Sequence, residues 1–266
     1  MPQGRMSGRV ALVSGGTQGV GEAVARQLAA EGAAGVAVCG RNAARGEAVR
    51  AAIAAQGCAA LHVPADLSVV ADCRAAVERT VERFGRLDAL ANCAGRTDRG
   101  SLDDTTEAVW DALFDTNVRG PFFLIQAAAA QMRRQGEGGS MVVIGSMQAY
   151  GGAPFLLPYA ATKGCLMTLT RGIANTLLRD RIRINMLNIG WTDTPNEHVV
   201  QREVHGRGDD WLEVVSAAQP YGRLIGTEEI ARACGFLLSD ESGMMSGAVI
   251  DYDQQVIGPM QDNPGL

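Results

Sequence analysis

Residues 10–21 read VALVSGGTQGVG: a short apolar run, a glycine-rich turn and the start of a second apolar pattern. The apolar run has β-branched residues at both ends, which is typical of a buried strand. Val20, Val24 and Leu28 then recur every four residues and predict a helix. We therefore expect strand, turn and helix in direct succession, the unit from which α/β sheets are built.

The glycines of this turn predict a phosphate site. Gly15, Gly19 and Gly21 carry no side chain, so the backbone can approach a pyrophosphate whose charge lies at the positive N-terminus of the helix. An ordinary tight turn is the alternative for the glycines alone. Their place at the first strand-to-helix junction of a longer alternating pattern favours dinucleotide binding.

The same alternation continues along the chain. Further strands are expected at 35–39, 59–63, 87–92, 141–146, 182–189 and 248–250. Further helices are expected at 43–55, 69–84, 105–117, 122–135, 159–179 and 227–238, with a break at Gly120-Pro121 between the fourth and fifth helices of the chain. Single helices between strands imply parallel pairing through right-handed crossovers. We predict one domain over residues 1–266: a doubly wound parallel α/β sheet of about seven strands with helices on both faces and a polar substrate loop at about 191–218.

Composition excludes several classes of protein. The chain has 266 residues, 47% of them apolar and 20% charged, which argues against disorder. Its net charge of −5 and lack of a basic tract argue against a nucleic-acid partner. No run approaches the roughly 18 apolar residues of a membrane span, so no membrane partner is expected. Six cysteines without any C-x-x-C pair predict neither disulfides nor a zinc site and favour the reducing cytoplasm.

Lysine occurs at a single position, and a tyrosine that could act in catalysis lies four residues before it. Lys163 follows Tyr159 by four residues, which places both side chains on one face of a helix. A nearby ammonium favours the phenolate, so it would lower the tyrosine pKa from about 10 and make Tyr159 a usable proton donor and acceptor. Ser146, at the end of a predicted strand, could bond a substrate oxygen, although alone it would more often cap the strand. A coincidental surface pair is the alternative for Tyr159 and Lys163.

Taken together, these motifs resemble those of the short-chain dehydrogenase/reductase family, over nearly all of residues 8–258. Residues 14–21 are similar to the family's T-G-x-x-x-G-x-G, and residues 92–95 match its N-x-A-G. The positions of the family's catalytic tetrad are held by Asn117, Ser146, Tyr159 and Lys163. The resemblance implies a Rossmann-type sheet, a nicotinamide cofactor and, usually, a homotetramer.

The resemblance also implies a role for each tetrad residue. Tyr159 would protonate a carbonyl or deprotonate an alcohol, while Ser146 holds the reacting oxygen. Lys163 would bond the nicotinamide ribose and lower the pKa of Tyr159, and Asn117 would anchor a water relay.

Cofactor contacts are carried over in the same way. Asp66 resembles the family's adenine contact, although an Asp at a helix N-terminus is the equal alternative. We expect Asn92 at a strand end against the cofactor, and Ile189 and Thr194 against the nicotinamide amide. The full expected set is Gly15, Thr17, Gln18, Gly19, Val20, Gly21, Arg41, Asp66, Leu67, Asn92, Ala94, Gly95, Tyr159, Lys163, Ile189, Gly190 and Thr194.

Two departures from the family pattern lie near the C-terminal half of the predicted sheet. The family's P-G-x-x-x-T appears at 189–194 without its proline. The family's usual D-G-G is Asp251-Tyr252-Asp253, which leaves the packing of the C-terminal tail open.

The end of the second strand bears on cofactor choice. An enzyme that uses NAD usually has an acidic residue there, and this chain has Gly40. Arg41 beside it suits the 2′-phosphate of NADP, whereas Gln18 stands where many NADP users carry a basic residue. NADP(H) is favoured and NAD(H) stays open, since Arg41 could be a solvated charge.

Substrate contacts are expected from the loops above the sheet. Gln148, Asn196, Glu197 and His198 could bind hydroxyls, with Trp191 as an apolar wall, which favours a polyol or sugar-like alcohol. Solvated loop residues are the alternative. The histidines are not at metal-ligand spacing, so no catalytic metal is expected.

The sequence therefore predicts an NAD(P)-dependent oxidoreductase that interconverts a small-molecule secondary alcohol and a ketone. A catalytically idle nucleotide-binding regulator on the same fold is the alternative, disfavoured because the whole tetrad is present. An epimerase or dehydratase with the same Tyr-Lys pair is disfavoured, because enzymes of that kind are longer chains with a different glycine spacing and a larger substrate domain.

Overall fold

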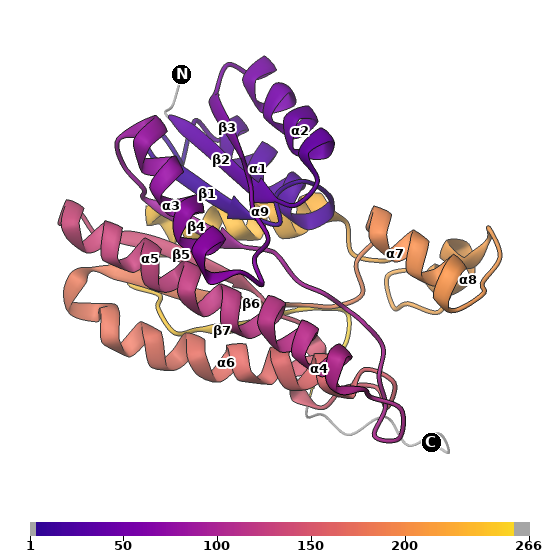
Figure 1. The fold of residues 1–266 in the computed structure, drawn as a ribbon. Helices are drawn as coiled ribbons and strands as arrows, with labels where there is room; N and C mark the ends of the chain where they lie inside the picture. Colours follow the sequence, from indigo (N-terminus) through magenta and orange to yellow (C-terminus); the bar gives the residue numbers. More distant parts are fainter. Residues whose placement is uncertain (1–3, 258–266) are drawn as a thin grey trace.

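In the computed structural model, which describes residues 4–257, the strands form one parallel sheet in the order β3-β2-β1-β4-β5-β6-β7 (Figure 1). The strands are β1 (Val10–Ser14), β2 (Gly35–Gly40), β3 (Ala59–Pro64), β4 (Ala89–Asn92), β5 (Gly139–Ile144), β6 (Ile182–Ile189) and β7 (Val249–Tyr252). The order reverses between β1 and β4. Ligands of such sheets bind at this reversal, beyond the carboxyl ends of the strands.

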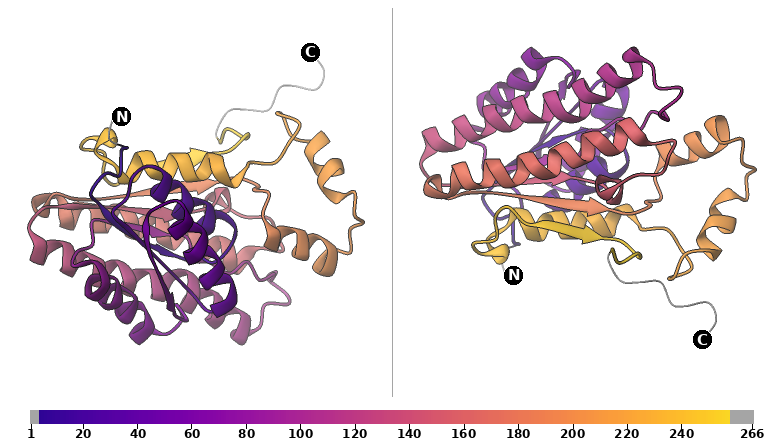
Figure 2. Two further views of the ribbon diagram at one scale, coloured as in Figure 1. Left: turned by 90° about the horizontal axis from the view of Figure 1, so that it is seen from above. Right: turned by 90° about the horizontal axis from the view of Figure 1, so that it is seen from below.

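Helices cover both faces of the sheet (Figure 2). One face carries α1 (Gly19–Ala30), α2 (Ala43–Ala55) and α9 (Thr227–Leu238). The other carries α3 (Val70–Phe84), α5 (Gly120–Gln135) and α6 (Leu157–Leu177). The helices α4 (Glu107–Phe114), α7 (Pro195–Val199) and α8 (Trp211–Ala217) lie at the carboxyl end of the sheet or beyond it. None of the described helices is both long and apolar enough to cross a membrane.

The core has two layers because neighbouring residues of a strand point to opposite faces. In β1, Ala11 and Val13 pack under α1 and α9, whereas Leu12 packs under α3 and α5. All five residues of this strand are buried. The continuous apolar run at the start of the sequence is thus explained by a central strand that is covered on both sides.

The predicted break at Gly120-Pro121 is absent. The chain stays helical from α4 through a π-helical turn at Asp115–Arg119 into α5. Gly120 N–H bonds to the carbonyl of Asp115, five residues back, so the bonding register changes where Pro121 has no N–H to donate. The proline therefore sits at the start of α5 without ending the helix.

Two predicted boundaries are also shifted. β5 pairs with β6 from Gly139 onward and ends at Ile144, so Ser146 lies two residues past the strand. Helix α6 begins at Leu157 because Pro158 occupies its first turn, where a missing N–H costs nothing.

The polar segment at 191–218 is more ordered than the predicted loop. It contains α7, a π-helical turn at Val200–Val204 and α8, which together project beyond the sheet (Figure 1). The hydroxyl of Thr194 accepts the N–H of Glu197 and caps α7. Trp211, Val215 and Leu224 form a small apolar core of their own, which orders a segment that reads as polar overall.

Candidate active site

Three elements place the tetrad at the carboxyl end of the sheet. Tyr159 and Lys163 lie on consecutive turns of α6. Ser146 follows β5, and its hydroxyl accepts the N–H of Gln148 at 3.2 Å. Asn117 lies in the π-helical turn before α5, a kind of distortion that is frequent at functional sites. All four are buried.

Lys163 is held deep in the site. Its ammonium donates to the carbonyl of Ile144 at 2.9 Å and lies 5.6 Å from the centre of the Tyr159 ring. Burial lowers the pKa of Lys163 from 10.5 to about 8. This lysine is therefore an ammonium near neutral pH that loses its proton more easily than a surface lysine.

The expected lowering of the Tyr159 pKa is not found in this structure. Burial raises the pKa of the phenol above 10.0, and only weaker contributions from Ser146 and from the charge of Arg99 act in the lowering direction. Burial is the largest influence on this phenol, and Lys163 is not among the groups that lower its pKa. As placed here, the phenol is a proton donor.

Asn117 fastens the loop after β4 to α6. Its side-chain oxygen accepts the N–H of Arg96 at 2.8 Å. Its amide donates to the Arg96 carbonyl at 3.0 Å and to the Thr162 hydroxyl at 3.1 Å. The side chain is thus committed to the protein, and the water relay stays a prediction.

A cleft of about 290 Å³ runs over the β1–α1 turn and reaches the tetrad. Its lining contains most of the residues expected to bind a cofactor: Gly15, Thr17, Gln18, Gly19, Val20, Gly21, Arg41, Asp66, Leu67, Ala94, Gly95, Tyr159, Lys163, Ile189 and Thr194. Segments far apart in the sequence therefore meet in one groove, as the motifs predict.

Two of the expected cofactor residues do not line this cleft. Asn92 is buried beneath it, where its side-chain oxygen accepts the Ser14 hydroxyl at 2.7 Å. This bond joins β1 to β4 and positions the turn rather than a ligand. Gly190 lines the neighbouring cavity instead, and the side chain of Asp253 lies directly against it.

The glycine turn fits a dinucleotide by shape. Gly15 and Gly19 have φ angles of 65° and 56°, which other residues rarely adopt. A Cβ on Gly15 would lie 2.7 Å from the Ala94 backbone, and one on Gly21 would lie 2.3 Å from the Gly15 carbonyl. The turn is therefore closed to side chains and leaves its backbone N–H groups at the N-terminus of α1.

Positive charge surrounds the end of β2. Arg41 lines the cleft and lies close enough to Asp66 to lower the pKa of that carboxyl, after the hydrogen bond from the Ser68 backbone. Arg45, on α2, donates to the side chain of Gln18 and so brings a second guanidinium to the glycine turn. The sequence pattern did not single out Arg45, because α2 approaches this turn only in the folded chain.

A second cavity of about 850 Å³ adjoins the cleft, and Tyr159 lines both. Ser146, Gln148 and Trp191 line this cavity, as expected of substrate contacts. Gln148 also accepts the N–H of Ala153 at 2.8 Å, which fixes the loop before α6.

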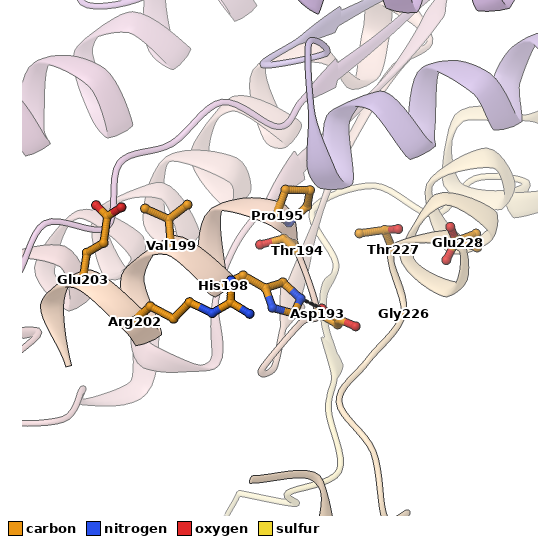
Figure 3. Close-up of a pocket in the computed structure, with 10 residues that line it drawn as sticks. All are labelled: Asp193, Thr194, Pro195, His198, Val199, Arg202, Glu203, Gly226, Thr227 and Glu228. Carbon is orange, nitrogen blue, oxygen red and sulfur yellow. Dashed lines mark hydrogen bonds and ion pairs between the residues drawn. The ribbon is translucent and has the colours of Figure 1, made fainter. Parts of the chain in front are cut away.

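Two expected substrate residues lie elsewhere. Asn196 lines the cofactor cleft, because it lies in the first turn of α7 on the side of the glycine turn. His198 lies in an outer pocket between α7 and the start of α9, where its ring nitrogen pairs with Asp193 at 2.8 Å (Figure 3). The sequence pattern did not predict α7, and on this short helix the side chains of Asn196 and His198 point to different sides.

The cavity also contains residues that the sequence pattern did not assign. Asp253 replaces a glycine of the family motif and lies against Gly190 in the cavity wall. Burial raises the pKa of its carboxyl. The departure from D-G-G was the available signal, since an added side chain must occupy space that the motif keeps free. Arg99, His205 and Arg207 line the same cavity. No group of three or more His, Cys, Asp or Glu within residues 4–257 could hold a metal ion.

Comparisons with known proteins agree with this geometry. A family model described as enoyl-(acyl carrier protein) reductase matches residues 15–254. An uncharacterised oxidoreductase of Methylorubrum extorquens is 35% identical over 93% of this chain and 97% of its own. An A-factor type gamma-butyrolactone 1'-reductase (1S-forming) of Streptomyces virginiae is 36% identical over 94% of this chain and 96% of its own. A solved short-chain dehydrogenase of Burkholderia cenocepacia in complex with NADP has a TM-score of 0.84 and 34% identity, covering 94% of this chain and 98% of its own.

Proposed function

The chain belongs to the short-chain dehydrogenase/reductase family, and on that premise we propose that it interconverts a secondary alcohol and a ketone with NADP(H). The observation that carries the proposal is that Tyr159 lines both the cofactor cleft and the adjoining cavity. A substrate oxygen in the cavity can therefore meet the phenol where the two spaces join. We assign residues 1–266 to one NAD(P)-binding domain with the 191–218 segment as its substrate side.

Each residue of the tetrad would have a separate role in the reaction. In reduction, the Tyr159 hydroxyl gives its proton to the carbonyl oxygen while Ser146 donates a hydrogen bond to that oxygen. Lys163, whose ammonium donates to the Ile144 carbonyl at 2.9 Å, would bond the nicotinamide ribose. The nicotinamide, when bound, supplies the hydride to the carbonyl carbon or accepts it from the alcohol carbon. Asn117 holds the loop after β4 in place.

Cofactor choice follows from charge at the end of β2. Arg41 and Arg45 lie beside the glycine turn, and Gly40 leaves no carboxylate there to repel a 2′-phosphate. The Burkholderia cenocepacia relative was solved with NADP, which supports the same preference. Asp66 lines the cleft and would contact the adenine.

Three further assignments complete the proposal. Gln148 and Glu197 line the cavity and could bind substrate hydroxyls, which supports a polyol or sugar-like substrate. A homotetramer is expected from the family, and Phe122 and Leu157 expose 36% and 44% of their surfaces. A reducing, cytoplasmic setting suits six cysteines that are all free.

Replacement of Tyr159 by Phe tests the central assignment. Loss of a positioned acid costs roughly 100- to 10,000-fold in rate, so turnover of a panel of ketones, sugars and polyols should fall by that range. Nicotinamide absorbance follows the reaction with each cofactor. Tyr150→Phe is the matched control, because Tyr150 is half exposed and bonds Asp251 outside the cavity.

Equal rates for the wild type and Tyr159→Phe would overturn the role of the phenol. Cofactor binding with no turnover of any compound by the wild-type protein would instead favour the regulatory alternative.

A further inference from the structure

The cavity beside Tyr159 has two arginines that form no ion pair with a carboxylate among residues 4–257. Arg99 comes from the loop after β4, and Arg207 from the segment between α7 and α8. Within residues 4–257 neither is within ion-pair distance of an Asp or Glu, whereas the neighbouring Arg96 pairs with Asp98 at 2.8 Å. A guanidinium left unpaired in a cavity wall is available to a ligand.

Contacts to the protein hold Arg99 in place. One of its nitrogens donates to the Thr97 carbonyl at 2.6 Å, and another lies 3.0 Å from His205 Nε2. The guanidinium also lies over the Phe155 ring, 5.9 Å from its centre. A guanidinium has five N–H donors, so these contacts orient the group and still leave donors for a ligand.

His205 belongs to the same cluster as an acceptor. Burial first, and then the charges of Arg99 and Arg207, lower the pKa of its imidazole. The neutral ring can accept a hydrogen bond from Arg99, so it orients that side chain without adding a charge. Arg207 lies over the Trp191 ring, 6.0 Å from its centre, and its charge also acts on His205, so both guanidiniums lie near this imidazole.

The carboxylates of the cavity are engaged elsewhere. One oxygen of Glu197 accepts from Trp191 Nε1 at 2.8 Å and from Gln201 Nε2 at 2.6 Å. Asp253 accepts the N–H of Gln254 at 2.7 Å, and burial raises its pKa. Both carboxylates line the cavity, and the charge of Glu197 also acts on His205, but neither lies within ion-pair distance of Arg99 or Arg207 among the described residues.

We propose that the substrate carries an anionic group such as a carboxylate besides its reacting carbonyl, and that Arg99 and Arg207 bind this group. The inference rests on the proposed function, because the same cavity holds the proton donor. Guanidinium and carboxylate form paired, charge-assisted hydrogen bonds. Arg99 also acts electrostatically on the Tyr159 hydroxyl, so the anion would lie close to the reacting oxygen.

The test compares each keto acid with its own uncharged ester. Levulinate, acetoacetate and their methyl esters are reduced with NADPH by the wild type, by Arg99→Met and by Arg207→Met. We expect a higher kcat/KM for the acids than for the esters in the wild type. Each variant should lose roughly tenfold on the acids, mainly through KM, and stay near the wild type on the esters. Arg202→Met is the matched control, because Arg202 pairs with Asp209 and lines only the outer pocket (Figure 3).

Two results would overturn the proposal. One is an equal kcat/KM for acid and ester in the wild type. The other is a loss in Arg99→Met that is as large for the esters as for the acids. If turnover is too slow to measure, equilibrium titration of the NADPH-loaded protein decides the same question: a preference for the acids that Arg99→Met removes supports the proposal, and no preference contradicts it.

Failure of the proposed function has a different signature. Esters reduced by the wild type but not by Tyr159→Phe would uphold the reductase assignment even if the acids gained nothing from the arginines. Absence of turnover with every ketone, together with preserved acid binding, would remove the reductase assignment and leave an anion-binding cavity.

Discussion

Arg41 is the side chain on which cofactor preference is expected to depend most. It lines the cleft at the end of β2, where Gly40 leaves no competing carboxylate. Arg41→Asp should reverse the charge that faces a 2′-phosphate and lower the ratio of NADP to NAD affinity by at least tenfold. Fluorescence titration with both reduced cofactors measures the ratio. Arg50→Asp on the exposed face of α2 is the control, and an unchanged ratio in Arg41→Asp would refute the assignment.

Lys163 should make the stability of the fold depend on pH. Its pKa is about 8 in the folded chain against an ordinary 10.5, so the unfolded chain binds more protons between these values. Stability therefore rises with pH across this interval, and below about pH 8 the folded chain holds the charge at full cost. From pH 8 to pH 9.5 the wild type should gain roughly 2 kcal/mol relative to Lys163→Met. Urea unfolding of both proteins at each pH measures this difference, and a constant difference would contradict it.

Motif residues were predictable because their chemistry fixes their spacing. Tyr159 and Lys163 are one helical turn apart. The turn after β1 has no room for side chains, so it needs glycines for its backbone to reach a phosphate. Residues without such a constraint were not predictable. The direction of His198 depends on a short helix, and the contribution of Arg99 depends on a contact with His205 more than a hundred positions away along the chain.

At the scale of elements, the junction between α4 and α5 leaves no room for a side chain at Gly120. A Cβ on Gly120 would lie 1.9 Å from the Leu67 carbonyl, so the start of α5 and the loop after β3 must move apart in Gly120→Ala. We expect a loss of about 1 to 3 kcal/mol of folding stability. Gly172→Ala is the control, because a Cβ at that exposed position of α6 has nothing within 4 Å and should stabilise by about 0.5 to 1 kcal/mol. Chemical denaturation of both variants measures their free energies of unfolding. Equal values would contradict the prediction, because the loop after β3 would then move away from α5 at no cost.

Element boundaries were predicted less well than element types. The pattern predicted a break at Pro121 because proline normally ends a helix, but a π-helical turn absorbs the missing donor. In the 191–218 segment the helices α7 and α8 are short, and each exposes a valine, Val199 and Val214. Their order depends on the Thr194 cap and on Trp211, signals that become specific only when the partners are known.

At the scale of the whole molecule, self-association is open to measurement. Apolar side chains such as Trp110, Phe122 and Leu157 expose 44%, 36% and 44% of their surfaces along α4, α5 and α6. We expect sedimentation equilibrium to give the mass of four 28.0-kDa chains. A single-chain mass across micromolar concentrations would reject the homotetramer.

The sheet itself was the most predictable feature of the molecule. Seven apolar runs separated by helical patterns fix a parallel sheet among the described residues, and the position of the glycine turn fixes where a ligand binds. The shape and charge of the substrate cavity were not predictable, because its walls come from segments that meet only through tertiary contacts.

The small apolar core of Trp211, Val215 and Leu224 has a consequence for evolution. Because α8 contributes to this core and α7 contacts it through His198 and Trp211, substitutions on their cavity side disturb little of the packing that stabilises the sheet. The tetrad and the glycine turn lie outside this segment. Lineages that duplicate such a gene can therefore diversify what the enzyme accepts while inheriting its chemistry intact, and directed selection in the laboratory should begin with the same segment.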